Sequence, residues 1–133
     1  YKRQDVCILS LGTNDAQIFY NLDNESTKFG LQNLIDSIRE ANSSTKIVIV
    51  PPVKITENIL HSGFSLMFNA DSINKILDVF YVFEEVAKQQ GCYYFDFNKF
   101  VSPSETDGLH YSTESHKIIA DKLAEFILEI TKF

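Results

Sequence analysis

Three short apolar runs constrain the fold of this chain more than any other feature. They are VCILSL at residues 6–11, KIVIV at 46–50 and CYYFDF at 92–97. A strand with one face in water alternates apolar and polar residues, whereas a parallel strand covered on both faces is apolar along most of its length. None of the three runs shows clean alternation. We therefore expect three buried parallel strands.

An amphipathic helical pattern follows each apolar run, at residues 29–42, 72–91 and 112–130. Gly91 is a natural stop for the second pattern, and Ser112 is an expected N-cap for the third. The order β-α-β-α-β-α is typical of a parallel sheet with helices on both faces. The residues expected on the buried helix faces are Leu31, Leu34, Ile35 and Ile38; Ile73, Ile76, Leu77, Phe80, Phe83 and Ala87; and His116, Ile119, Ala120, Leu123, Ile127 and Ile130.

The stretch from Pro51 to Asn69 is a long connection that leaves the carboxyl end of the second expected strand. Open α/β folds bind their ligands at this edge of the sheet, and long loops there often carry function. Two of its aromatic residues, Phe64 and Phe68, fit either a substrate pocket or the core. Of these two interpretations, we favour the core.

The first apolar run is expected to have further strands beside it. It carries neither charge nor proline, and such a strand at a sheet edge would promote pairing with another chain. The sequence also starts without Met. We therefore expect an N-terminal segment or a second chain to complete the sheet.

Charge and composition exclude several functional classes. The 133 residues are 44% hydrophobic and 23% charged, as in ordinary globular domains. The net charge of -6 argues against nucleic acid or an anionic membrane as the main partner, since both attract clustered Lys and Arg. No apolar run approaches the ~20 residues of a membrane span. Cys7 and Cys92 are expected to be small buried hydrophobic residues, not a disulfide framework.

The segment LGTND, residues 11–15, ends the first apolar run with a turn. Gly12 permits a sharp change of backbone direction. Asn14 then lies at the mouth of the sheet, where its amide N–H can stabilise an oxyanion. The same residues also fit an ordinary Gly/Asn/Asp turn without a catalytic role.

The segment DGLHYSTESH, residues 107–116, contains the second group of candidate residues. Asp107 and His110 can approach each other in a tight turn at Gly108. The carboxylate can then accept the Nδ1 proton and leave Nε2 as an outward-facing base, which is the acid–histidine half of a nucleophilic triad. A metal site would require Asp107, His110 and His116 to converge. That alternative is weaker, because His116 falls on the expected buried face of the last helix. A loop histidine without a role is the remaining interpretation of His110.

Together the two segments resemble the SGNH hydrolase family, also called GDSL esterases and lipases. GTND at 12–15 matches the family's Gly-x-Asn-Asp block, and DGLH at 107–110 matches its Asp-x-x-His block. The resemblance covers essentially the whole chain. It implies a three-layer α/β/α fold with a parallel flavodoxin-like sheet, a small-molecule ester substrate and no cofactor. The implied roles are general base for His110, orientation of that base for Asp107, oxyanion donor for Asn14, and support for Gly12, Asp15 and Gly108.

The sequence departs from the family pattern in one respect. The family's nucleophilic Ser, in a Gly-Asp-Ser block, and the block that supplies a second oxyanion donor are both missing from residues 1–133. The chain therefore resembles the third strand onward of a sheet with order 2-1-3-4-5, as the C-terminal portion of a single domain. Two other hypotheses stay open: a catalytically inactive binding or structural module, and a metal-dependent hydrolase.

Overall fold

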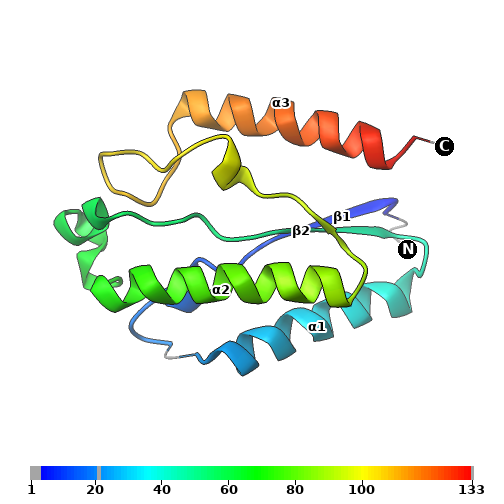
Figure 1. Ribbon diagram of the computed structural model, residues 1–133, viewed down its shortest axis with the longest axis horizontal. Coiled ribbons are helices and arrows are strands. Elements are labelled where there is room, and N and C mark those ends of the chain that lie inside the picture. Colours follow the sequence, from blue (N-terminus) through cyan, green and yellow to red (C-terminus); the bar gives the residue numbers. More distant parts are fainter. Residues whose placement is uncertain (1–3, 21, 133) are drawn as a thin grey trace.

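The computed structural model describes residues 4–20 and 22–132, which form one parallel sheet between two layers of helices (Figure 1). The strand order in the sheet is β1-β2-β3. Helices α1 and α2 cover one face, and α3 lies over the other. This confirms the expected three-layer α/β/α fold. The elements are β1 (Val6–Ser10), α1 (Asn24–Ala41), β2 (Lys46–Val50), α2 (Ala70–Gln89), β3 (Tyr93–Tyr94) and α3 (Thr113–Ile130).

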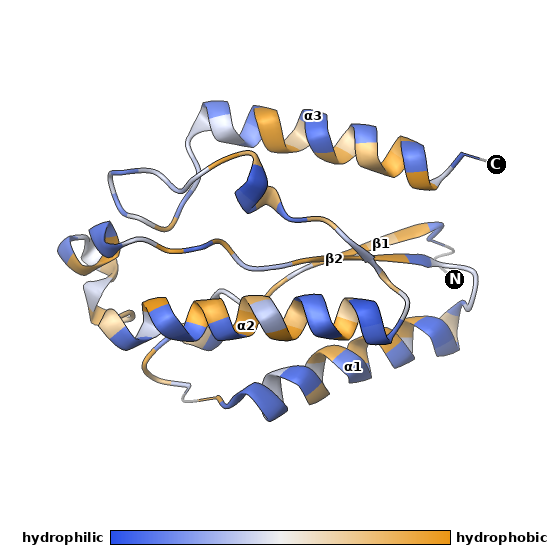
Figure 2. Ribbon diagram, in the orientation of Figure 1, coloured by the Kyte–Doolittle hydropathy of each residue, from blue (hydrophilic) through white to orange (hydrophobic). Residues whose placement is uncertain are grey.

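Strand β2 is the centre of the sheet and the most deeply buried element. It pairs in parallel with β1, where Ile8 lies opposite Val48, and with β3, where Val48 lies opposite Tyr93. Residues 47–50 are each at most 3% exposed. Helices on both faces exclude water from both sides of the strand, which explains its unbroken apolar sequence. Strands β1 and β2 are mostly orange in Figure 2, which marks them as hydrophobic.

The layer formed by α1 and α2 buries most of the expected helix faces. Leu31 and Ile35 of α1 pack with Val79 and Phe83 of α2 against the sheet. Leu34 and Leu77 were also expected there, but both are exposed. Leu77 lies about 100° around the helix from Ile76, and therefore outside the face that contacts the sheet.

Several element boundaries differ from the expected ones because of local capping. Helix α1 begins at Asn24, before the apolar pattern starts, because the Asp23 side chain accepts a hydrogen bond from Ser26 N and caps it. Helix α2 begins at Ala70, where Asn69 and Ser72 form a capping box. Strand β3 stops after Tyr94, since Asp96 caps a short 3-10 turn that follows.

Helix α3 contacts the sheet partly through other residues than expected, since Ala120 is exposed and Phe126 takes part in the contact. Its Leu123, Phe126 and Ile130 pack against Val48 and Val50. The Ser112 side chain accepts from Ser115 N, which confirms the expected N-cap.

The expectation that His116 is buried under α3 is wrong. His116 is exposed, and its ring meets Tyr111 edge-on with centroids 6.0 Å apart. The first turn of the helix precedes Ile119, which is the one buried residue of α3. A side chain in that first turn therefore lies outside the packed layer.

Two loop regions lie together at one end of the molecule, opposite both termini (Figure 1). One is the long connection after β2, with 3-10 turns at Glu57–His61 and Gly63–Leu66. The other leads from β3 to α3. Phe68 is 1% exposed, as expected for core, whereas Phe64 is only half-buried.

The two cysteines are free thiols, and both are half-buried where full burial was expected. Burial raises the pKa of the Cys92 thiol, and the nearby Arg39 guanidinium opposes this. Within residues 4–20 and 22–132, no helix is both long and apolar enough to span a bilayer.

Candidate active site

Asp107 and His110 form a hydrogen-bonded pair within one tight turn. Asp107 Oδ2 lies 2.8 Å from His110 Nδ1. Asp107 Oδ1 accepts hydrogen bonds from the backbone N–H groups of Leu109 and His110, each at 2.9 Å. One carboxylate therefore holds both the backbone of the turn and the imidazole, and the predicted contact between acid and histidine is present.

The charge of Asp107 fixes which nitrogen of His110 carries a proton. Partial burial raises the pKa of the Asp107 carboxyl, but hydrogen bonds from Leu109 N, His110 N and the His110 ring outweigh it and hold this pKa below its usual value. The ionised carboxylate can only accept hydrogen bonds, so Nδ1 must be the protonated nitrogen. In the neutral imidazole, Nε2 is then left with a free lone pair, as a general base requires.

The backbone around Gly108 closes this turn and ties it to the long connection. Gly108 N donates to Ser104 O at 2.7 Å, and Ser104 N donates to His110 O at 2.6 Å. Gly108 O accepts from Thr56 N at 3.0 Å. Gly108 has a φ of +68°, in the left-handed region that favours glycine. A glycine at position 108 therefore permits both the tight turn and the close contact with the long connection.

We expect Gly108→Ala to destabilise the protein by about 2–4 kcal/mol. A Cβ at this position would lie 2.6 Å from Thr56 Oγ1 and 2.7 Å from Ile59 N, in addition to the strain at positive φ. Urea unfolding measures the change. Gly63→Ala is the matched control, because its Cβ would meet nothing within 4 Å. An equal effect of both substitutions would contradict the assignment of a special role to Gly108.

Phe64 packs against the ring of His110. The two ring centroids are 5.1 Å apart, with an angle of 55° between the planes. Phe64 comes from the 3-10 turn Gly63–Leu66 of the long connection. The imidazole therefore has the Asp107 carboxylate at Nδ1 and an aromatic ring at its side, although 61% of its side chain is exposed.

The LGTND segment folds into a 3-10 turn immediately after β1. Gly12 has a φ of +98°, and a Cβ there would lie 3.0 Å from Val79 and 3.1 Å from Phe83. The turn spans Asn14–Ala16 and closes with a bond from Gln17 N to Asn14 O. Gly12 thus lets the chain reverse direction close to α2 and leaves Asn14 exposed.

Asp15 is the half-buried middle residue of this turn, so burial raises the pKa of its carboxyl, against a smaller lowering by the Lys75 ammonium. Its neighbour Ala16 is 1% exposed. Asp15 therefore lies on the inner side of the segment, in keeping with a supporting position.

Two cavities show how the candidate residues lie at the carboxyl ends of the strands. Asn14 lines a cavity of about 460 Å³ together with Leu11 and Leu22, and His110 is not among its lining residues. A second cavity of about 240 Å³ is lined by Thr13, Tyr111 and His116, among others. The two sequence segments therefore meet at one edge of the sheet. A common cleft for Asn14 and His110 stays a prediction.

The alternative metal site lacks a converging set of ligands. In residues 4–20 and 22–132, no group of three His, Cys, Asp or Glu side chains is placed to hold a metal ion. Asp107 and His110 are in contact, whereas His116 packs against Tyr111. The donor set that this hypothesis needs is therefore not assembled in the part of the chain that the structure describes.

Sequence reasoning missed several residues that hydrogen-bond to the candidate site residues or to the turn that carries them. Thr56 and Ser104 hold the Asp107–His110 turn, and Gln17 bonds to Asn14. Gln17, three residues after Asn14, and Ser104, four residues before Gly108, both carried a local signal, whereas Thr56 did not. Phe64 was considered as a pocket residue, but its contact with His110 depends on how the long connection folds.

Comparison with solved structures supports the fold. An inhibitor-bound aryl esterase of M. smegmatis matches with a TM-score of 0.82 and 21% identity over 94% of this chain and 60% of that one. A carbohydrate acetylesterase of Sinorhizobium meliloti matches with a TM-score of 0.78 and 22% identity over 92% and 61%. A peptidoglycan O-acetylesterase matches with a TM-score of 0.71 and 21% identity over 95% and 37%. The chain spans about 60% of the length of the first two structures.

No curated protein sequence matches this chain. A family model does match, over residues 1–118, which is most of the sequence and includes both candidate segments. That match agrees with the fold, with the GTND turn after β1 and with the Asp107–His110 pair before α3. The chain belongs to the GDSL-like lipase/acylhydrolase family.

Proposed function

We propose that this chain is the C-terminal portion of a single SGNH-type domain that hydrolyses esters through a nucleophilic serine. The serine is supplied by a segment outside residues 1–133, which also completes the sheet beside β1. His110 is the general base, Asp107 orients it and Asn14 donates to the oxyanion. The observation that carries the proposal is the 2.8 Å contact between Asp107 Oδ2 and His110 Nδ1, together with the free Nε2 that it implies.

The proposed mechanism is acyl transfer in two steps. His110 Nε2 takes the proton of the serine hydroxyl while the serine oxygen attacks the ester carbonyl, and Asp107 stabilises the imidazolium. The Asn14 amide N–H donates to the negative carbonyl oxygen. The imidazolium then gives its proton to the departing alcohol. A water molecule, activated by the same base, releases the acid and regenerates the serine.

The solved relatives support small esters as the substrate class. They are an aryl esterase, a carbohydrate acetylesterase and a peptidoglycan O-acetylesterase, so the same fold serves esterases that act on different esters. We propose that this protein acts on an ester of comparable kind. Substrates that combine a short acyl group with aryl or sugar leaving groups are therefore the first choice for assays.

The proposal predicts a sharp difference between the full-length protein and residues 1–133. The full-length protein should hydrolyse p-nitrophenyl acetate and be labelled by a fluorophosphonate probe, which reacts with an activated serine. Residues 1–133 alone should do neither, because His110 has no serine to activate. Steady-state turnover and mass spectrometry of the labelled peptide measure the two effects.

Two outcomes would contradict this proposal. A full-length protein that folds but shows neither turnover nor labelling would be an inactive module. Turnover by residues 1–133 alone, abolished by His110→Ala, would place the nucleophile inside the chain. Finding a Gly-Asp-Ser block encoded upstream of Tyr1 would support the proposal that the protein is an enzyme.

A further inference from the structure

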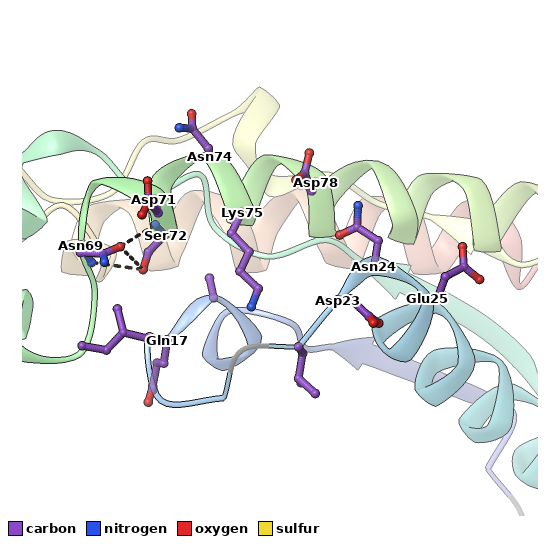
Figure 3. A pocket seen from close by; sticks show the side chains of 13 residues that line it. Gln17, Asp23, Asn24, Glu25, Asn69, Asp71, Ser72, Asn74, Lys75 and Asp78 are labelled. Atoms are coloured by element: carbon purple, nitrogen blue, oxygen red, sulfur yellow. Dashed lines mark hydrogen bonds between the residues drawn. The ribbon is translucent and has the colours of Figure 1, made fainter.

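Gln17 lies between the candidate oxyanion donor and a polar cavity. Its side-chain Nε2 donates to Asn14 Oδ1 at 2.9 Å. Its backbone N–H donates to Asn14 O at 3.0 Å and closes the same 3-10 turn. The side chain also lines a cavity of about 750 Å³, whose other lining residues belong to 16–18, 22–25 and the N-cap and first turns of α2, and which Figure 3 shows from close by.

The direction of the Asn14 amide decides whether Asn14 can serve catalysis. A primary amide has a donor end and an acceptor end, and only the donor end stabilises an oxyanion. Asn14 is exposed, and water, which both donates and accepts hydrogen bonds, does not favour either orientation of its side-chain amide. When Gln17 donates to Oδ1, the acceptor end is occupied, and the Nδ2 donor end points away from Gln17.

We propose that Gln17 is a positioning residue that fixes the Asn14 amide with its donor end toward the substrate. The inference rests on the proposed function, because it assumes that Asn14 donates to the oxyanion. It goes beyond that function by assigning a role to a residue that does not touch the reacting atoms. The requirement at position 17 is a hydrogen-bond donor, not an acceptor.

The remaining groups around Gln17 supply the controls. The cavity wall beside it carries Asp23, Asn24, Asp71 and Lys75 (Figure 3). None of these four side chains bonds to Asn14 in the part of the chain that the structure describes. A change of charge at Asn24 therefore alters the same cavity without changing the partner of the Asn14 amide.

The test uses three substitutions in the full-length protein with p-nitrophenyl acetate as substrate. Gln17→Lys keeps only a donor, Gln17→Glu keeps only an acceptor, and Gln17→Met keeps the length with neither. We expect Gln17→Lys to retain kcat within about threefold of the wild-type value. Glu should lower kcat by about 10- to 100-fold with KM little changed, since removing an oxyanion donor costs about 10²–10³-fold. The kcat of Gln17→Met should lie between those of Gln17→Lys and Gln17→Glu.

A double-mutant cycle with Asn14→Ala separates positioning from a general structural role. If Gln17 acts through Asn14, the differences among the three variants disappear when Asn14 is Ala. Asn24→Asp should leave kcat within about twofold. The NMR signals of the Asn14 side-chain amide provide a second readout, and should shift in Gln17→Glu but not in Asn24→Asp.

Equal loss in Gln17→Lys and Gln17→Glu would overturn the proposal, as would a Gln17→Glu loss that persists in Asn14→Ala. Both results leave the proposed function intact when His110→Ala still abolishes turnover. Failure of the proposed function would give a different result in the same assay. In that case Asn14→Ala and His110→Ala would themselves leave turnover unchanged.

Discussion

His110→Ala in the full-length protein should lower kcat/KM for ester hydrolysis by about 10⁴-fold or more. Removing the histidine leaves the serine without a base to take its proton, and removes the group proposed to return a proton to the leaving alcohol. The structure supports an effect on chemistry alone, because the His110 side chain is 61% exposed and its loss opens no cavity in the core. Steady-state kinetics with p-nitrophenyl acetate measures the loss, and circular dichroism verifies the fold.

His116→Ala is the matched control for this prediction. His116 is also an exposed histidine near the same edge of the sheet, but it packs against Tyr111 and has no carboxylate partner among the described residues. We expect kcat/KM within about twofold of the wild type and a change in unfolding free energy within about 0.5 kcal/mol. Truncating a buried side chain would cost more stability, but His116 is exposed. Unchanged turnover in His110→Ala would refute the proposed mechanism.

Asp107→Asn should lower kcat by about 10³–10⁴-fold while the protein stays folded. The Asn side-chain oxygen can still accept from Leu109 N and His110 N, so the turn is retained. Its Nδ2, however, is a donor and stabilises the tautomer in which His110 Nδ1 is unprotonated. The proton then resides on Nε2, where it blocks general-base catalysis. Kinetics measures the loss, and the ¹⁵N shifts of the imidazole identify the tautomer.

Asp121→Asn is the control for the change in charge. Asp121 is an exposed carboxylate of α3 that pairs with Lys117, a surface ion pair of the kind that contributes little to stability. We expect its kcat to be unchanged. A wild-type rate in Asp107→Asn, or a loss of rate with no change of tautomer, would show that Asp107 does not orient the base.

The overall fold follows from the sequence because its determinants are strong and local. Apolar runs such as that at 46–50 indicate strands buried on both faces, and the helical patterns between them dictate parallel pairing. The Asp107–His110 contact was predictable for the same reason, since the partners are three residues apart across a glycine. The sheet of three parallel strands and the 2.8 Å contact between Asp107 Oδ2 and His110 Nδ1 confirm these two structural predictions.

Features that depend on caps or on distant segments were not predictable in the same way. Helix α1 starts at Asn24 because Asp23 caps it, and the cap precedes the apolar pattern by several residues. The exposure of His116 depends on where α3 crosses the sheet, which periodicity does not specify. The contacts of Thr56 with Gly108 and of Phe64 with His110 join segments about 50 residues apart, and only the folded long connection creates them.

The hydrogen bonds between Ser104 and His110 have a consequence for how the site tolerates change. The acid, the base and the backbone groups that orient them all lie within seven consecutive residues, closed by the bonds of Ser104 to Gly108 and His110. The hydrogen bonds that align the acid with the base therefore all come from one short segment of the chain. Outside this segment, Thr56 N donates to Gly108 O and Phe64 packs against the His110 ring, so the long connection sets where the pair lies relative to the rest of the fold. Substitutions in the surrounding loops that preserve these two contacts should therefore leave the alignment of the acid with the base unchanged.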